Sequence, residues 1–571
     1  MNIKNIHWSK PISRQWPLML AYIVMIGWIS VTKNPIPRWM LIFLHAYIIA
    51  SLVTLSKSKV VKWLAYFIIY VLFIFELILE QLFGMNISPE VIVLLVETNI
   101  RESMEFMESM KGKSQWIGIP IYLLCIIVLN LFAERYHEKI NNKLKDTLTA
   151  KGLKVVAAIL LIGGVVFSYH YIALFRCQEM NEVDEWRSHM RHPDDLVTKL
   201  VVSFYDISLS EKEMTNVILL AEQKESLKIT SDLDSLNIIV IIGESYIREH
   251  SPLYGYPLQT TPFLSQEKEN GRLFVFTDVV SPYNQTTRVI RNMLSCNSLG
   301  DGETWASAPP FTALYKKGGY HVVLYDNQKT IDFGQVFTFS LNTYLYHPRI
   351  VNACYNETND NTFEYDGELV EYYRQKRSVH PAPHQLLLFH LMGQHISFNK
   401  RYPPGFNHFN ADSTIFRQEE WLTEGMRKDI AHYDNATRYN DYVIQQIIDL
   451  YAQQNTVVIL MADHGEEVYD YRDNMGRDDW DMGSNPEQVL RFQYMIPFVV
   501  WCSDKYMERH PNTITQLQEA TGRPMMLDNI CQLLFHLSGL HSRYYHAERD
   551  ILSPNYHCPP RIINDKQDCT I

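Results

Sequence analysis

The 571-residue sequence contains no Cys-x-x-Cys pair, no internal repeat and no low-complexity tract. The first absence excludes the common cysteine-based zinc modules, and the others leave no sign of a repeat architecture. The net charge is −11, so the chain lacks the basic excess of a nucleic-acid-binding protein, and no nucleic-acid partner is expected. A chain of this length exceeds one domain, and we expect two or more units.

What the chain does have is a largely apolar first third. Five stretches are candidates for membrane spans, at residues 17–31, 39–55, 61–83, 116–132 and 155–175. The first is short for a hydrocarbon core that takes about 20 residues, and basic residues precede it, as in a signal peptide. Because no small-residue cleavage site follows it, we expect a retained anchor.

Basic residues predict the orientation of these spans. Lysines lie between the second and third spans, and lysines and an arginine lie between the fourth and fifth. Both connections and the N-terminus therefore belong in the cytoplasm. An odd number of spans then leads the chain outside after about residue 176. We predict a transmembrane domain over 1–176, a helical bridge over 177–235 and an external domain over 236–571.

The segment "NISPEVIVLLVETNIRESMEFMESMKGK" separates the third and fourth spans. Ser88 followed by Pro89 is a good helix start. We predict an amphipathic helix near 88–112 that lies at the outer membrane surface.

The eight cysteines have no readable pairing. Cys125 lies within a predicted span, and the other seven would face an oxidising compartment, where disulfides are permitted. Seven is odd, so at least one stays free or pairs outside the chain. Cys558 and Cys569 are candidates for a tail disulfide. Cys502 and Cys531 lie in apolar surroundings, where free buried thiols are equally consistent.

Beyond residue 236 the pattern changes to short apolar runs bounded by turn residues. They lie at 237–245, 321–328, 385–395, 456–465 and 495–502, separated by helical stretches such as 286–294, 311–317 and 433–453. Continuous apolarity predicts strands buried on both faces. We therefore predict an α/β domain with a mostly parallel central sheet and helices on both sides.

Polar residues follow these strands where each one ends. Glu244 ends the first, Asp326 belongs to the second, and Asp463 and His464 end the fourth, in "VVILMADHGEE". Ligands of open α/β sheets bind outside the carboxyl ends of the strands. Carboxylates with an imidazole suit Zn²⁺ or Mn²⁺, although Asp463 alone could simply cap a following helix.

Two histidines and two threonines complete the set of candidates. His395 lies beyond the third strand and is the better ligand candidate, whereas His390 lies within the apolar run and is as consistent with a core histidine. Thr286 and Thr287 begin a predicted helix, where phosphate binds well. Either is also consistent with an ordinary N-cap, and metal coordination would convert a hydroxyl there to a nucleophile.

Three segments carry a family resemblance: "GESYIREHSPLYGYPLQTTPFL" (243–264), "HLMGQHISFNKRYPP" (390–404) and "ADHGEE" (462–467). Together with five spans before an external α/β domain, they resemble the membrane-bound phosphoethanolamine transferases of the alkaline phosphatase/sulfatase superfamily. The resemblance covers essentially the whole chain. It implies a sulfatase-like fold, a bacterial inner-membrane location and a catalytic domain in the periplasm.

The resemblance also implies roles for single residues. Glu244, Asp463 and His464 would hold zinc together with a threonine nucleophile, and aligning "MLS" (293–295) gives that role to Thr286. His395 would contact the transferred phosphate or act as acid/base. The substrate contacts that it suggests are Thr98, Glu102, Asn327 and Gln328, to which we add His390.

Two departures bear on the acceptor. Where the lipid A-modifying branch has cysteines around the nucleophile, this chain has Pro282 and Asn292, and where that branch has a later histidine it has Met482. A lipopolysaccharide core sugar is therefore as consistent an acceptor as a lipid A phosphate, and a second metal is in doubt.

The resulting expectation is a monomeric, zinc-dependent enzyme, with manganese as the alternative metal. It would move phosphoethanolamine from phosphatidylethanolamine to lipopolysaccharide through a threonine intermediate, in contact with membrane lipids. One rival is a lipoteichoic-acid-synthase-like glycerophosphate transferase, and another is a membrane sensor without catalysis. A sulfatase would need Cys or Ser in a Cys/Ser-x-Pro-x-Arg setting, which "NQTTRV" does not offer.

Overall fold

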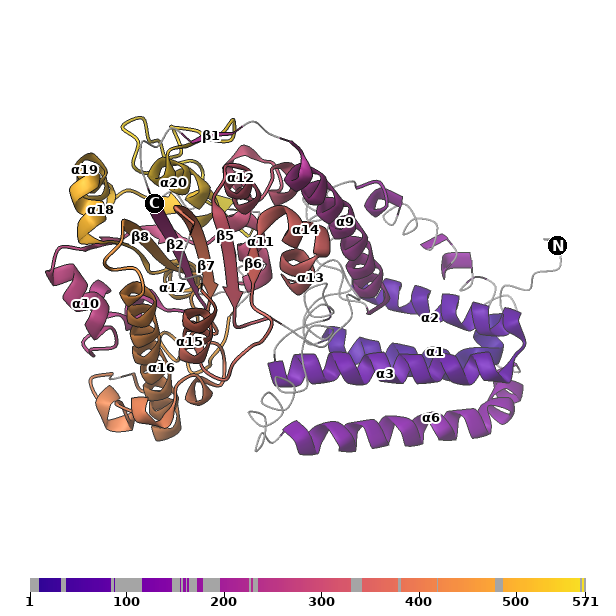
Figure 1. Cartoon of the computed structure of the whole chain (residues 1–571). Helices are drawn as coiled ribbons and strands as arrows, with labels where there is room; N and C mark the ends of the chain where they lie inside the picture. Colours follow the sequence, from indigo (N-terminus) through magenta and orange to yellow (C-terminus); the bar gives the residue numbers. More distant parts are fainter. Residues whose placement is uncertain are drawn as a thin grey trace. The chain divides into compact units, whose positions relative to one another are not determined.

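The computed structural model describes residues 10–31, 37–83, 87, 115–145, 155, 158–160, 162–163, 172–177, 196–224, 227–229, 235–329, 341–377, 382–417, 419–477, 486–564 and 567–568. The chain divides into two compact units, Met1–Glu211 and Lys212–Ile571. Both are drawn in Figure 1.

Long helices make up most of what is described in the first unit. They are α1 (Lys10–Val31), α2 (Pro37–Ser56), α3 (Lys59–Phe83) and α6 (Gln115–Lys145). Each overlaps one of the first four predicted spans. Within the described part of the chain, one helix, Lys59–Leu79, is long and apolar enough to cross a membrane, and Ile42–Ser56 is a shorter apolar helix. Most of the fifth predicted span and the predicted 88–112 helix lie outside the described residues, so the count of five stays a prediction.

A buried charge in this unit is paired. Glu76 on α3 is 1% exposed and accepts a hydrogen bond from the backbone N–H of Ile87 at 2.9 Å. It also forms an ion pair with Lys199 on α9 (Leu196–Glu222). A carboxylate among apolar helices is tolerated when it is neutralised in this way.

The second unit is built on a seven-stranded sheet of order β3-β9-β8-β2-β7-β5-β6. The strands are β2 (Leu236–Gly243), β3 (Leu273–Phe276), β5 (His321–Asp326), β6 (Glu357–Thr358), β7 (His384–His390), β8 (Thr456–Ala462) and β9 (Phe498–Cys502). The five strands from β8 to β6 are parallel, whereas β9 pairs antiparallel with both β8 and β3. The sheet is therefore mixed, and β9 runs against its neighbours.

Both faces of the sheet are covered, as continuous apolarity predicts. Along β2, Ile238, Val240 and Ile242 pack with α11 (Thr286–Leu294), α12 (Phe311–Lys317) and α20 (Ile530–Ser538). The alternate residues Ile239 and Ile241 pack on the other face, with α10 (Pro262–Glu269), α15 (Asp366–Lys376) and α16 (Glu424–Asp449). Figure 1 shows α16, α15 and α10 on one side of the strands and α12 and α20 on the other.

The predicted helix at 433–453 begins earlier in the structure, at Glu424. Thr423 caps it, because its hydroxyl accepts a hydrogen bond from the Met426 N–H at 3.3 Å. The two other helices predicted by range, 286–294 and 311–317, coincide with α11 and α12.

Cys125, Cys354, Cys502 and Cys531 form no disulfide with any described residue. Cys502 and Cys531 are 0% and 1% exposed, which fits the alternative of buried thiols left open for these two. Cys569 lies outside the described residues, so the tail disulfide with Cys558 stays a prediction.

Candidate active site

The pairing of β2 with β8 brings the first two candidate ligands together. Gly243 is the register partner of Ala462, and the Asp463 N–H donates to the Gly243 carbonyl at 2.9 Å. The next residue on each strand is therefore a carboxylate, Glu244 beside Asp463. The structure therefore places these two side chains next to one another at the ends of adjacent strands.

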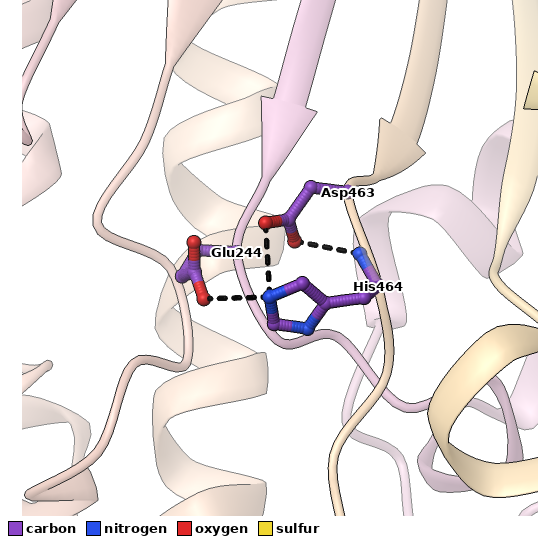
Figure 2. A group of neighbouring side chains, drawn as sticks. All are labelled: Glu244, Asp463 and His464. Carbon is purple, nitrogen blue, oxygen red and sulfur yellow. Dashed lines mark hydrogen bonds and ion pairs between the residues drawn. The ribbon is translucent and has the colours of Figure 1, made fainter. Parts of the chain in front are cut away.

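Glu244, Asp463 and His464 form what we call the ligand cluster, shown in Figure 2. One oxygen or nitrogen from each lies within 4.8 Å of the others, and all three side chains are 0% exposed. His464 Nε2 is 3.1 Å from Asp463 Oδ2 and 3.5 Å from Glu244 Oε1. Both carboxylates thus converge on a single ring nitrogen.

Thr286 reaches the same cluster from the first turn of α11. Its hydroxyl donates to Glu244 Oε2 at 2.9 Å, and its Oγ1 lies 3.2 Å from His464 Nε2. The helix buries Val289, Ile290 and Met293 against the sheet, which fixes the end that carries Thr286. Of the two threonines that the sequence offers, the structure brings Thr286 to the ligand cluster.

Close backbone contacts hold the loops that carry the ligands. A Cβ on Gly465 would lie 1.9 Å from the Phe492 carbonyl oxygen, and one on Gly393 would lie 2.8 Å from the Glu244 nitrogen. Ser245 has a φ of 55°, a conformation that non-glycine residues rarely adopt. Tyr433 stabilises it by donating its hydroxyl to the Ser245 carbonyl at 2.6 Å.

The electrostatics of the ligand cluster favour a bound cation. Burial, and next the Glu244 carboxylate, raise the pKa of Asp463 well above its ordinary value. Burial, and next the Arg477 charge, lower the pKa of His464 to about 3. The imidazole is therefore neutral near pH 7, as a metal ligand must be.

The atoms of the ligand cluster fit a metal ion. His464 Nδ1 donates to the Gly465 carbonyl at 2.7 Å, so Nε2 carries the lone pair that faces the carboxylates. The buried oxygen Asp463 Oδ2 accepts no hydrogen bond from any described residue, an arrangement that a buried carboxylate rarely keeps. Two oxygens and one imidazole nitrogen, with the Thr286 oxygen alongside, match the donor set and number of a Zn²⁺ site.

The two candidate histidines have different surroundings. His395 is half-buried, and it interacts electrostatically with Glu244 and His464 of the ligand cluster. His390 is 1% exposed, and its Nδ1 is 2.9 Å from Asp326 Oδ1. Its Nε2 has no hydrogen-bond partner in the described part of the chain, so a role for His390 toward substrate stays a prediction.

The two amide candidates make internal contacts. Gln328 Nε2 donates to Glu244 Oε2 at 3.1 Å and to the Leu391 carbonyl at 2.9 Å. Asn327 donates to Asp366 Oδ1 at 2.8 Å. Asp366 in turn accepts the N–H groups of Met392 and Gly393. Both amides therefore position the site, and their contact with substrate stays a prediction. Thr98, Glu102 and Met482 lie outside the described residues.

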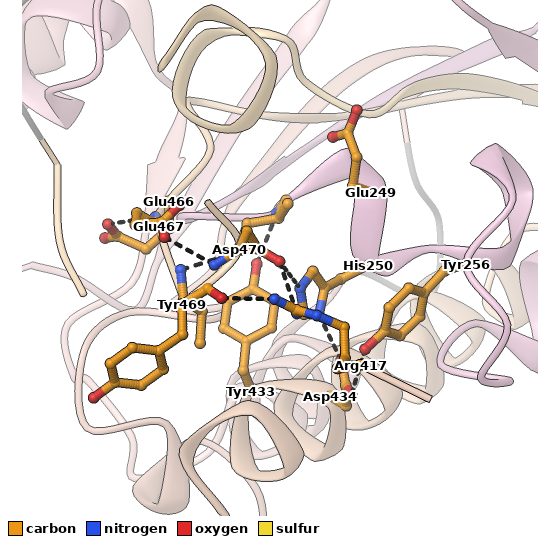
Figure 3. A network of polar contacts seen from close by, with 12 residues as sticks. Glu249, His250, Tyr256, Arg417, Tyr433, Asp434, Glu466, Glu467, Tyr469 and Asp470 are labelled. Carbon is orange, nitrogen blue, oxygen red and sulfur yellow. Dashed lines mark hydrogen bonds and ion pairs between the residues drawn. The ribbon is translucent and has the colours of Figure 1, made fainter. Parts of the chain in front are cut away.

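Asp470, which follows the ligand cluster in the chain, belongs to a second buried network, shown in Figure 3. His250 Nδ1 is 2.7 Å from Asp434 Oδ1, and its Nε2 is 3.1 Å from Asp470 Oδ1. Arg417 donates to the same Asp470 oxygen at 3.0 Å. We call these four residues the His250 network. The backbone N–H of Asp470 donates a hydrogen bond to Glu467 Oε1 at 2.8 Å, which positions Asp470 on the loop.

Three residues of the site are not among the residues predicted from the sequence. Arg477 lies 2.5 Å from His464 Nε2, Ser245 donates to Glu244 Oε1 at 2.7 Å, and Asp366 holds the turn at Gly393. Ser245 adjoins a predicted ligand and could have been proposed from that alone. Arg477 and Asp366 lie in polar segments whose composition gives no reason to select them.

Comparison with protein families gives a match to the sulfatase family over residues 236–523. The match covers half of the chain and includes both strands that carry the ligands. The chain belongs to the sulfatase family. It is 24% identical over 507 residues to phosphoethanolamine transferase EptC of Escherichia coli K12, covering 85% of this chain and 81% of that one. It is also 24% identical over 305 residues to the Kdo(2)-lipid A phosphoethanolamine 7''-transferase of the same organism, covering 53% and 51%.

Solved structures of similar fold agree with this sulfatase-family membership. The C-terminal periplasmic domain of EptC from Escherichia coli, in complex with Zn, superposes with a TM-score of 0.50 at 26% identity, covering 60% of this chain and 94% of that one. The integral membrane protein lipooligosaccharide phosphoethanolamine transferase A from Neisseria meningitidis gives 0.58 at 16% identity, covering 95% and 96%. The resemblance to phosphoethanolamine transferases that the three motifs indicate is confirmed.

Proposed function

We propose that this sulfatase-family protein transfers phosphoethanolamine from phosphatidylethanolamine to a lipopolysaccharide acceptor. The observation that carries the proposal is the position of Thr286, whose Oγ1 is 2.9 Å from Glu244 Oε2 and 3.2 Å from His464 Nε2. A hydroxyl at a helix start among metal-type ligands is equipped to become a nucleophile. The names of the relatives supply the group that it would carry.

Zinc is the metal that we propose for the ligand cluster, held by Glu244, Asp463, His464 and the Thr286 oxygen. The zinc complex of the similar EptC domain supports this choice, as does the mixture of carboxylate and imidazole ligands. When bound, such an ion lowers the pKa of a coordinated hydroxyl and stabilises negative charge on phosphate.

In the first step, the Thr286 oxygen forms a bond to the phosphorus of phosphatidylethanolamine. The bond between phosphorus and the glycerol oxygen breaks, and diacylglycerol leaves with the proton that Thr286 gives up. In the second step, an acceptor oxygen attacks the phosphorus, the bond between phosphorus and the Thr286 oxygen breaks, and the proton that the acceptor gives up returns to Thr286. His395, half-buried beside the ligand cluster, is the group that we propose to relay protons in this exchange.

Both proposed substrates are lipids, which supports a catalytic unit at a membrane surface. We propose a multi-pass bacterial inner-membrane protein whose Lys212–Ile571 unit lies in the periplasm. The apolar helix Lys59–Leu79 and the full-length fold match to an integral membrane protein support this location. The acceptor is a lipid A phosphate or a core sugar, and the name of the lipid A-directed relative favours neither over the other for this chain.

The test is the intact mass of the purified full-length protein after incubation with phosphatidylethanolamine and zinc. We expect a phosphoethanolamine adduct on the wild type and on Thr287→Ala, the neighbouring threonine control. The Thr286→Ala variant should form it at least about 10³-fold more slowly, because the nucleophile is gone. An adduct that persists in Thr286→Ala would contradict the assignment of the nucleophile. If an adduct formed only with phosphatidylglycerol, then phosphatidylglycerol and not phosphatidylethanolamine would be the donor.

A further inference from the structure

Arg477 lies at the ligand cluster although it follows His464 at a separation of 13 residues. Its Nη1 is 2.5 Å from His464 Nε2 and donates to the Asn284 carbonyl at 2.9 Å. Its Nε is 3.5 Å from Glu466 Oε2. The guanidinium is therefore held from two sides.

The same ring nitrogen is the neighbour of both Arg477 and the proposed nucleophile. His464 Nε2 lies 3.2 Å from Thr286 Oγ1, so the guanidinium and the hydroxyl approach it together. The ligand side chains are fully buried, whereas the Arg477 side chain is 31% exposed. Arg477 therefore borders the open side of the site, where a phosphate group would arrive.

An arginine N–H and a metal ion cannot use one lone pair at the same time. The ligand cluster fits a metal at His464 Nε2, so Arg477 has to release that nitrogen when the lone pair is used for coordination. The Asn284 carbonyl still anchors its Nη1 close by. Because guanidinium has five N–H donors in a planar fork, it keeps donors free for an anion.

The surroundings favour a phosphate oxygen as that anion. Gln285, the N-cap of α11, makes no side-chain cap hydrogen bond to the first turn. Thr286 in that turn and Arg477 both lie at His464 Nε2, so the positive end of the helix lies near Arg477. A phosphodiester gains negative charge at its non-bridging oxygens in the transition state, and fixed cations stabilise it there.

We propose that Arg477 binds a non-bridging oxygen of the phosphodiester that reacts at Thr286. This makes it a catalytic residue, in addition to those that the motifs suggest. The proposal rests on the proposed function for its substrate class, a phosphate anion, and does not depend on which lipid supplies it.

The experiment uses the zinc-loaded full-length protein and inorganic phosphate as the probe, measured by titration calorimetry. Arg477→Met should weaken phosphate binding about tenfold or more, because a charge-assisted hydrogen bond is lost. Arg477→Lys should retain part of the affinity, since it keeps the charge but not the fork. Arg491→Met is the matched control, because Arg491 is a surface residue paired with Glu249, and it should bind as the wild type does.

A second readout is zinc affinity by competition with a chelator. Arg477→Met should bind zinc as tightly as the wild type or more tightly, since a cation competing for His464 Nε2 is removed. Weaker zinc binding would overturn the proposal and make Arg477 a support of the ligand cluster. Unchanged phosphate affinity with zinc retained would overturn it too.

These outcomes are separable from failure of the proposed function. Phosphate binding requires neither a lipid donor nor an acceptor. If phosphatidylethanolamine leaves no adduct while Arg477→Met still shows a reduced affinity for phosphate, then the proposed donor is wrong and the Arg477 assignment stands. If the adduct forms and Arg477→Met binds phosphate normally, the donor stands and the Arg477 assignment is wrong.

Discussion

Two buried groupings of histidine and carboxylate in the second unit differ in how their charge is balanced. In the His250 network, the imidazole lies between Asp434 and Asp470, and Arg417 adds a second cation. In the ligand cluster, two carboxylates surround one imidazole, and a buried oxygen of Asp463 accepts no hydrogen bond from the described residues. The first pairs two carboxylates with two cations, whereas the second places two carboxylates around a neutral imidazole, with Arg477 as the neighbouring cation.

The histidines show the difference most directly. Burial lowers the pKa of His250, but Asp470 and Asp434 outweigh it and raise that pKa to about 10. The pKa of His464 is lowered to about 3, by burial and by Arg477. Near pH 7 one imidazole is a cation held in place and the other is a neutral ligand. A histidine next to aspartates is therefore not enough to identify a metal site. The charges of all the side chains around the histidine have to be considered.

The largest expected contrast comes from replacing His464 with Gln. The rate of phosphoethanolamine adduct formation should fall on the order of 10³-fold, because a metal ligand is lost. The free energy of unfolding of the metal-free protein should change by about 1 kcal/mol or less, since one neutral group replaces another. Mass spectrometry of the adduct and thermal unfolding in chelator check both halves. A large decrease in the free energy of unfolding of the metal-free His464→Gln variant would contradict the expected difference between the ligand cluster and the His250 network.

The same replacement at His250 should have the opposite effect. His250→Gln removes a buried cation between two carboxylates, which should lower the free energy of unfolding by roughly 3–5 kcal/mol. Zinc affinity should stay within a few-fold of the wild type. Denaturant unfolding of the full-length protein measures the first quantity, and chelator competition measures the second.

His321→Gln is the control for that substitution. His321 is 37% exposed and lies 3.9 Å from Glu357, and such surface pairs contribute little, at most about 1 kcal/mol. If His250→Gln costs no more than His321→Gln, then the His250 network does not stabilise the fold by charge pairing.

A further expected effect is in the pH dependence of stability. The pKa of His250 is about 10 in the folded protein and about 6.5 in an unfolded chain. A raised pKa means that the stabilisation is complete below about pH 6.5 and is lost as the pH rises through about 10. The difference in melting temperature between wild type and His250→Gln should therefore narrow from neutral pH toward pH 10. A constant difference over that interval would show that His250 is not titrating there.

Much of the second unit follows from local sequence pattern. Continuous apolar runs such as the one at Val457 predict doubly covered strands, and the helices at Thr286 and Phe311 begin where predicted. The antiparallel direction of β9 cannot be predicted from the sequence, because an apolar run is equally compatible with parallel and antiparallel pairing. The early start of α16 depends on a cap by Thr423, which the apolar pattern does not contain.

The candidate site divides in the same manner. Glu244, Asp463 and His464 could be predicted because strand ends share one edge of a sheet. Arg477 and Asp366 could not, because one follows a polar loop and the other begins α15, and tertiary contacts bring both to the site. The sequence resemblance selected Thr286 over Thr287, in agreement with the geometry.

The pairing of Gly243 with Ala462 has a consequence for biogenesis. Its two strands are far apart in the sequence, as the separation of 218 residues between Ser245 and Asp463 records. Contacts this distant form late and slowly, since a long loop has to close first. A nascent chain therefore offers no complete set of ligands until its central strands have paired. Binding of the proposed metal ion would then be a late step of folding, and it would not direct the early steps.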